Sequence, residues 1–135
     1  MDIVEQIRAA YARYNARDFG FAVTGFADDI VWAVPPAAGG PFHGRDEVVS
    51  FFNGLAQAFG SHTITLDDAV VEGADRAICK ITHAFTTHDG RRASLRAMHD
   101  WTRHDGMFTA FDEIADTVVF ALLTGEVVPA APVAG

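Results

Sequence analysis

The tripeptide His-Asp-Gly occurs twice in the chain, at 88–90 and at 104–106, and each copy separates two stretches of alternating apolar and polar residues. Such alternation is the period of a half-buried strand, and an Asp-Gly turn with a left-handed glycine joins antiparallel neighbours. The two copies therefore predict three consecutive antiparallel strands, with Gly90 and Gly106 at positive φ. Because the turn of a hairpin fixes its pairing, the strand register follows by counting outward from each turn.

The predicted register brings a histidine and a carboxylate together. Counting from the first turn places Cys79 opposite His99. Counting from the second turn, taken as a three-residue loop, places His99 opposite Phe111, so that Glu113 lies diagonally beside His99 on the same face. A histidine and a carboxylate side by side on a buried sheet face are the parts of an acid–base site.

The odd-numbered residues of the first two strands form the inner face of this sheet, and polar residues alternate with them. A single histidine on such a face is more often a hydrogen-bonded core residue than a catalyst, and this interpretation comes first for His83. A solvated side chain is the alternative for Glu113, because the inner face of the third strand is less clear. We expect the remaining histidines, in loops, turns or strand ends, to face solvent: His43, His62, His88 and His104.

Composition limits the possible classes of function. The 135 residues suffice for one domain with its own core. The net charge is −8 and Lys and Arg do not cluster, so neither nucleic acid nor an anionic membrane is an expected partner. The single cysteine, Cys79, cannot form an internal disulfide. Neither a basic and apolar leader nor an apolar run of about 18 residues is present, so we expect a cytoplasmic protein.

The pattern before the sheet is helical. Apolar residues repeat at three and four positions between about Asp2 and Arg17, which predicts an amphipathic helix. Asp18 is a candidate N-cap for a short helix to Phe26, and Gly60 is the expected C-cap of a third helix. Other expected elements are a strand at 30–34, a loop at 35–44, a strand at 62–71, a turn at 72–75, and a helical turn or strand extension at 117–124. We expect a single domain over 1–126 and a loose tail over 127–135.

Several segments occur in a characteristic order: Phe26-Ala27-Asp28-Asp29-Ile30-Val31-Trp32, Phe42-His43-Gly44-Arg45-Asp46, Phe51-Phe52, His99 through Trp101 to Asp105-Gly106, and Phe111-Asp112-Glu113 with Asp116-Thr117. Over residues 2–124 the chain thereby resembles the nuclear transport factor 2-like superfamily, and within it the SnoaL-like group related to ketosteroid isomerase and polyketide cyclases. The resemblance implies an α+β, cone-shaped fold. In it a strongly curved antiparallel sheet wraps around three N-terminal helices and leaves an inner pocket.

The activity implied by the resemblance is carried over residue by residue, because the superfamily hosts isomerases, cyclases, dehydratases, epoxide hydrolases and binding modules. In SnoaL-like cyclases a carboxylate on the last strand is the acid–base group, with a histidine on the preceding strand beside it. Glu113 and His99 occupy what look like those positions. The base of ketosteroid isomerase is missing, since residues 33–35 are Ala-Val-Pro. The positions of its oxyanion donors resemble those of Tyr11 or Tyr14 and of His99.

The leading hypothesis is a small-molecule enzyme that moves protons on an apolar carbonyl compound, by isomerisation or aldol-type cyclisation, without metal or organic cofactor. Glu113 would be the base, with a pKa raised by an apolar pocket. His99 would orient it or donate to the enolate oxygen, and Tyr14 would be a second donor. Metal binding is not expected, because one carboxylate and one histidine do not complete a site. The residues expected to bind substrate are Trp32, Phe52, Phe59, His83, Trp101 and Phe111.

The alternative hypothesis is a non-catalytic ligand-binding or assembly module of the same fold. Under either hypothesis we expect a small apolar or aromatic ligand and a homodimer formed through the outer face of the sheet, where Met98 lies among polar residues. A closed cavity in which Glu113 touches His99 would favour the enzyme. A filled cone with Glu113 pointing outward would favour the module.

Overall fold

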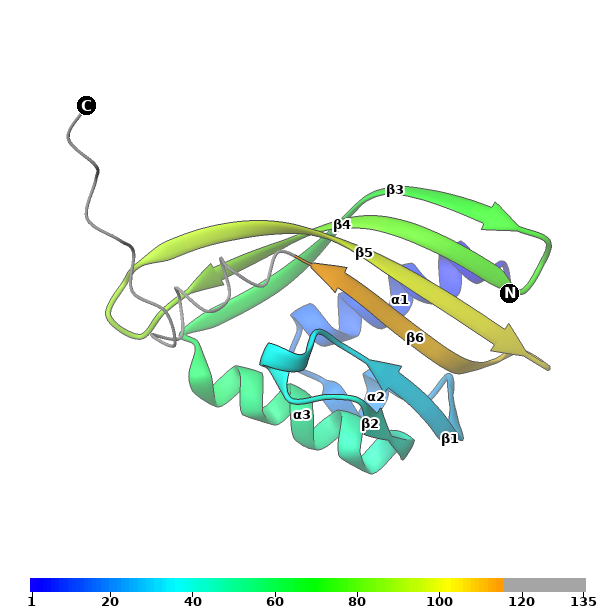
Figure 1. Cartoon of the computed structure of the whole chain (residues 1–135), viewed down its shortest axis with the longest axis horizontal. Coiled ribbons are helices and arrows are strands. Elements are labelled where there is room, and N and C mark those ends of the chain that lie inside the picture. Colours follow the sequence, from blue (N-terminus) through cyan, green and yellow to red (C-terminus); the bar gives the residue numbers. More distant parts are fainter. Residues whose placement is uncertain (116–135) are drawn as a thin grey trace.

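A computed structural model describes residues 1–115 of the chain (Figure 1). The elements in chain order are α1 (Ile3–Asn15), α2 (Phe19–Ala22), β1 (Phe26–Ala33), the short 3-10 helix η1 (Pro36–Ala38), β2 (Phe42–His43), α3 (Gly44–Ala58), β3 (Ser61–Glu72), β4 (Arg76–Thr86), β5 (Arg92–His104) and β6 (Met107–Ala115). The element expected at 117–124, the domain boundary at 126 and the tail at 127–135 lie outside the described residues.

Six strands form one curved sheet that arches over the helices (Figure 1). Their order across the sheet is β2-β1-β6-β5-β4-β3. Neighbouring strands are antiparallel except for β1 and β6, which run parallel. A parallel pair needs a long crossover, and the chain from β2 to β5 supplies it. The predicted α+β fold with a curved sheet around helices is confirmed, and the β1–β6 pair is a departure from an all-antiparallel sheet.

Helix α1 places two tyrosines under the sheet. The side chain of Asp2 caps the helix by accepting hydrogen bonds from the first free backbone N–H groups. The predicted apolar stripe is buried, and α1 packs against β3 and β4. The stripe consists of Ile3, Ile7, Ala10, Tyr11 and Tyr14.

Several boundaries differ from the sequence expectation, and the loop expected at 35–44 contains η1, β2 and the first residue of α3. Asp18 caps α2 as predicted, but the helix ends at Ala22, and β1 already begins at Phe26. The ring of Phe26 is buried in the core, so inward packing extends the strand toward the helix. Helix α3 ends with Phe59 at its C-cap position, one residue before Gly60. None of the helices among residues 1–115 is long and apolar enough to cross a bilayer.

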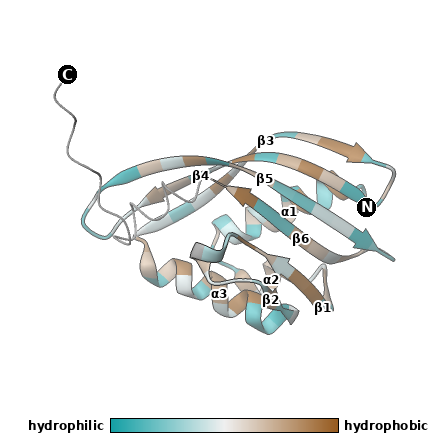
Figure 2. Ribbon diagram, viewed as in Figure 1, coloured by the Kyte–Doolittle hydropathy of each residue, from teal (hydrophilic) through white to brown (hydrophobic). Residues whose placement is uncertain are grey.

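The hairpin of β4 and β5 has the predicted register. Cys79 pairs with His99 and His83 with Leu95, and Gly90 has a φ of 90°. Buried and exposed residues alternate along both strands, with the odd positions inside. Figure 2 shows hydrophilic and hydrophobic bands along the strands of the sheet. The first His-Asp-Gly turn therefore fixes which side chains of these strands reach the concave face.

The hairpin of β5 and β6 differs from the prediction. Asp105 and Gly106 both have positive φ, 49° and 79°, and form a two-residue turn of the kind that suits antiparallel strands. His104 therefore pairs with Met107 instead of lying in a loop. This turn shifts the register by one residue relative to the predicted three-residue loop.

An irregularity in the same hairpin shifts the register by one residue more. It lies between the pairs made by Thr102 and Arg103, and beyond it His99 pairs directly with Glu113. The predicted partner of His99, Phe111, was therefore wrong by two residues. Because side chains alternate with a period of two, the double shift keeps Glu113 on the inner face.

Candidate acid–base site

Glu113 lies at the junction of three strands. Its side chain is only 13% exposed, and one oxygen, Oε2, accepts hydrogen bonds from Nε2 of both His83 and His99, at 2.6 Å each. His99 is the direct neighbour of Glu113 across β5 and β6, as the sequence anticipated in outline. The other oxygen, Oε1, receives no hydrogen bond from any residue that the structure describes.

His83 reaches Glu113 from β4, two strands away. By register, the inner-face position between them on β5 is Ala97, which pairs with Ile81 on one side and Ala115 on the other. A methyl group there leaves room for the imidazole to extend over β5. The expectation that His83 is a hydrogen-bonded core residue is confirmed, and the partner of His83 is the carboxylate of Glu113.

The second nitrogen of His99 continues the network toward α1. Nδ1 of His99 lies 2.6 Å from the hydroxyl oxygen of Tyr11, and the indole N–H of Trp101 donates to that same oxygen at 3.1 Å. All three side chains are buried. We call Tyr11, His99 and Trp101 the Tyr11 arm.

The second nitrogen of His83 continues the network in another direction. Nδ1 of His83 lies 2.7 Å from Nε2 of His62, and Nδ1 of His62 lies 2.5 Å from the hydroxyl oxygen of Tyr14. We call Tyr14, His62 and His83 the Tyr14 arm. The two arms meet at Glu113 and form one continuous buried chain of hydrogen bonds.

The solvent-exposed position expected for His62 is wrong, because only 8% of the residue is exposed. His43, His88 and His104 do face solvent, as expected. The missed signal lay in the alternation of β3: His62 shares its parity with Ile64, which packs against the core. A histidine at the start of that apolar face points inward with it.

A carboxylate at the junction fixes the order of protons in both arms. Since Glu113 can only accept, His83 and His99 must each carry a proton on Nε2, which leaves Nδ1 as an acceptor when the ring is neutral. His62 then donates from Nε2 to His83. Tyr11 donates its hydroxyl proton to Nδ1 of His99, and Tyr14 donates its hydroxyl proton to Nδ1 of His62. Every hydrogen bond of both arms points toward Glu113.

The pKa shifts agree with this order. Burial acts to raise the pKa of Glu113, but the hydrogen bonds from His83 and His99, together with the charge each imidazole can carry, hold that pKa well below its usual range. Burial lowers the pKa of His62 to about 3 and also lowers that of His99. Glu113 is therefore ionised at neutral pH, and these two imidazoles are neutral.

The raised pKa expected for Glu113 from its apolar surroundings is thus wrong. Desolvation is present, but the two imidazole donors outweigh it. Burial does raise the pKa of Tyr11 and Tyr14, so both phenols keep their protons. Within residues 1–115 the carboxylate of Glu113 contacts the imidazoles of His83 and His99 and forms no ion pair with Lys or Arg.

Two small hollows adjoin the network on its helical side, with volumes of about 30 and 40 Å³. Glu113, His83 and His62 line the larger, and Tyr11 and Trp101 line the smaller. Each holds no more than a few water molecules, so a ligand would have to displace side chains. Residues that line both are Tyr14, Trp32, Phe52, Ile64 and His99.

All the predicted substrate-binding residues except Phe59 line one or both of these hollows, His83 included. Trp32, Phe52 and Phe111 line the larger hollow, where Trp32 stacks on Phe111 with ring centroids 3.6 Å apart. Trp101 lines the smaller one. Phe59 lines neither and packs against the ring of Phe85, so it is part of the core.

A metal ion would need a different arrangement of the same atoms. The ligand atoms of His83, His99 and Glu113 lie within 4.8 Å of one another, and the second histidine removes the reason given above for expecting no metal. Two ligands of one zinc ion, however, lie about 3 Å or more apart at bond lengths of about 2.1 Å. The nitrogen–oxygen distances of 2.6 Å are those of hydrogen bonds.

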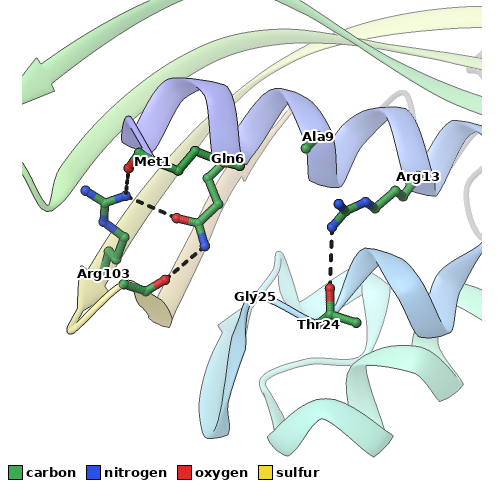
Figure 3. Close-up of a pocket in the computed structure, with 8 residues that line it drawn as sticks. Met1, Gln6, Ala9, Arg13, Thr24, Gly25 and Arg103 are labelled. Carbon is green, nitrogen blue, oxygen red and sulfur yellow. Dashed lines mark hydrogen bonds between the residues drawn. The ribbon is translucent and has the colours of Figure 1, made fainter.

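A larger hollow of about 390 Å³ lies between α1 and the tip of the β5–β6 hairpin (Figure 3). Arg103 donates there to the carbonyl oxygen of Met1 and to the side chain of Gln6, which in turn donates to the carbonyl oxygen of Gly106. Its polar groups thus hold the hairpin to the helix. Among residues 1–115, those that line this hollow include no histidine or carboxylate.

Solved structures with the same fold identify what this chain is similar to. The chain is similar to an NTF2-like protein of unknown function from Burkholderia pseudomallei, with 25% identity, 90% of this chain and 95% of that chain covered, and a TM-score of 0.83. It is similar to TerC, co-crystallised with polyporic acid, with 28% identity, coverage of 90% and 97%, and a TM-score of 0.83. A putative polyketide cyclase from Xanthomonas campestris shares the fold at 16% identity, coverage of 90% and 95%, and a TM-score of 0.76.

No curated protein matches the chain. Residues 7–111 match the SnoaL-like domain family, a span that runs from within α1 into β6 and includes both arms of the network but ends two residues before Glu113. The resemblance seen in the sequence is therefore confirmed. The chain belongs to the SnoaL-like domain family of the NTF2-like superfamily.

Proposed function

We propose that this protein is a small-molecule enzyme that performs acid–base chemistry on an apolar carbonyl compound, by isomerisation or aldol-type cyclisation, without a cofactor. The observation that carries the proposal is the carboxylate of Glu113, which lies on the wall of an aromatic hollow, is ionised at neutral pH and has one oxygen unpaired within the described residues. An ionised carboxylate on the wall of a hollow can accept a proton.

The surrounding side chains suit a ligand that is mostly apolar. Phe51, Phe52 and Leu55 of α3 face Trp32 and Phe111 of the sheet across the larger hollow. Because this hollow holds only a few waters, ligand entry requires the α3 side chains to move. The likeness to TerC, which was crystallised with polyporic acid, supports an aromatic compound as the ligand.

The second candidate function is a non-catalytic binding or assembly module, and the small volume of the hollows favours it. The inward position of Glu113 and its contact with His99 favour the enzyme. We rank the enzyme first, because a continuous network that ends on an ionised carboxylate is costly to bury and adds nothing to the binding of an apolar ligand.

The proposal is tested by screening for ligands by thermal shift among aromatic polyketides, steroids, small enones and polyporic acid, and then following each hit for turnover by absorbance. Glu113→Gln should abolish turnover, since an amide cannot accept the proton. Asp112→Asn is the matched control, because Asp112 is the exposed neighbour on the same strand and should be dispensable. Turnover that survives in Glu113→Gln would contradict the proposal.

A further inference from the structure

The two ends of the network differ in what remains available to a ligand. The hydroxyl oxygen of Tyr11 donates to His99 and accepts from Trp101. That of Tyr14 donates to His62 and accepts nothing from the residues that the structure describes. Tyr14 also lines both hollows, whereas Tyr11 lines the smaller one alone. The chain of hydrogen bonds is therefore capped at Tyr11 and open at Tyr14, on the side where a ligand would lie.

The proton order of the Tyr14 arm runs from this open end to the carboxylate. Each group presents a proton to the next group inward and an acceptor to the one before it. A proton that arrives at the oxygen of Tyr14 can therefore displace the protons ahead of it without any ring having to turn. The opposite direction is blocked in the resting state, because Nε2 of His83 already carries a proton.

Resting on the function proposed above, we infer that the Tyr14 arm is a relay that carries a proton from a bound ligand to the His83–Glu113 pair. A C–H bond of the ligand breaks, its electron pair stays on the ligand as an enolate, and the proton joins the oxygen of Tyr14. The phenol proton of Tyr14 moves to Nδ1 of His62, and the Nε2 proton of His62 moves to Nδ1 of His83. His83 is then doubly protonated and forms an ion pair with Glu113.

The step is balanced without any further reactant. The ligand gains one negative charge and the network, anionic at rest, becomes neutral. Running the same shifts backward returns a proton from Tyr14 to the ligand. If the returning proton joins a different carbon of the enolate from the one that lost it, the product is an isomer. The relay therefore suits a conjugated carbonyl compound.

The relay also assigns a role to His62 that the sequence did not suggest. Tyr14 is the group that touches the ligand, and His62 and His83 act through it as positioning residues. The weak basicity of Glu113, which disfavours direct removal of a carbon-bound proton, is no obstacle here, because its charge stabilises the imidazolium of His83.

The test makes the phenol of Tyr14 more acidic and determines which group then holds its proton. In the full chain with ¹⁵N-labelled histidine, Tyr14 is replaced by 3,5-difluorotyrosine, whose phenol is far more acidic and nearly the same size. At pH 7 the relay predicts an absorbance band of the fluorinated phenolate, together with ring signals of one doubly protonated histidine of the Tyr14 arm. In the Glu113→Gln background the phenol should keep its proton, because no carboxylate remains to stabilise the imidazolium of His83.

The relay would be overturned by a fluorinated phenol that keeps its proton with Glu113 present, or by a phenolate with all histidines still neutral. Persistence of the imidazolium signals in Glu113→Gln would also overturn it. If Glu113→Gln does not fold, His83→Gln serves as the control, since it cuts the relay one link earlier. No substrate is needed, so failure of the relay leaves the proposed function intact, with Glu113 acting directly through Oε1. Failure of the proposed function appears instead as turnover independent of Glu113.

Discussion

The Tyr11 arm and the Tyr14 arm start from the same carboxylate and use the same kinds of side chain, yet they end differently. The Tyr11 arm is short and closed, because Trp101 donates to its last oxygen. The Tyr14 arm has one more imidazole and ends on a hydroxyl that borders both hollows. The difference indicates a division of labour, in which one arm fixes Glu113 and the other connects it to the ligand space.

The comparison also separates stability from function. A closed buried arm loses two hydrogen bonds when its terminal hydroxyl is removed, whereas an open arm loses one. The closed arm should therefore matter more for folding and the open arm more for chemistry. The following measurements test this division.

The largest expected effect is the pH dependence of folding. The fold holds His62 and His99 neutral, with lowered pKa values, so unfolding takes up a proton at each once the pH falls below the ordinary histidine value of about 6.5. The contribution of these two neutral histidines to the free energy of unfolding is complete above about pH 6.5. It is lost as the pH falls, at up to about 1.4 kcal/mol per pH unit for each histidine.

Urea denaturation at pH 7.5, 6.5 and 5.5 measures this slope. His62→Gln and His99→Gln should each reduce by one the number of protons taken up on unfolding. His104→Gln, at the exposed end of β5, is the control and should leave the slope unchanged. Below about pH 4.3 the lowered pKa of Glu113 adds a further loss in the same direction. A free energy of unfolding that does not change from pH 7.5 to 5.5 would show that these imidazoles are not held neutral.

The second effect separates the two tyrosines. Tyr11→Phe leaves the acceptor of His99 and the indole N–H of Trp101 without a partner in a buried place, which should cost about 3 kcal/mol of unfolding free energy. Tyr14→Phe removes the donor of His62 alone and should cost about 1 kcal/mol. Equal losses for the two variants, measured by urea denaturation, would remove the distinction between closed and open arms.

The third effect cuts one arm from the carboxylate. Ala97→Leu places a larger side chain where His83 extends over β5, so the His83–Glu113 hydrogen bond should break while that of His99 remains. Overpacking should lower the unfolding free energy by about 2 kcal/mol. Ring ¹⁵N spectra should show a change at His83 and none at His99. A spectrum in which both histidines change, or neither does, would refute this description of the junction.

The smallest effect on the stability of the single chain is expected for a residue on the outer face of β6. Ile114 follows Glu113 but points to solvent, with 70% of it exposed. We propose that this face, with Met98 and Ile114, forms a homodimer. Ile114→Lys should convert the dimer to monomers and change protomer stability by less than about 0.5 kcal/mol. Light scattering that gives a mass near 14.5 kDa for the wild type would reject the dimer.

The sequence predicted the inner face of the sheet better than its pairing. The alternation around the two His-Asp-Gly turns identified His99 and Glu113 as neighbours, although the turn at Asp105 and the irregularity near Thr102 each moved the register by one residue. Periodicity survives such paired shifts, whereas the identity of the cross-strand partner does not.

The electrostatics of the site depended on contacts between distant segments. His83 and Glu113 are 30 residues apart, on strands that are not neighbours, and no local pattern shows that an imidazole crosses Ala97 to reach the carboxylate. Desolvation alone therefore gave the wrong direction for the pKa of Glu113. His62 could have been placed inside from its parity with Ile64, but its contact with Tyr14 of α1 depends on how the helix packs.

The order of protons around Glu113 is most directly read from the ring nitrogens of the three buried histidines. In ¹⁵N spectra of the wild-type chain at pH 7, His62, His83 and His99 should each carry a proton on Nε2 and none on Nδ1. Both arms would then point at an ionised carboxylate. A proton on Nδ1 of any of these rings, or a doubly protonated ring at rest, would contradict that order and the acid–base function built on it.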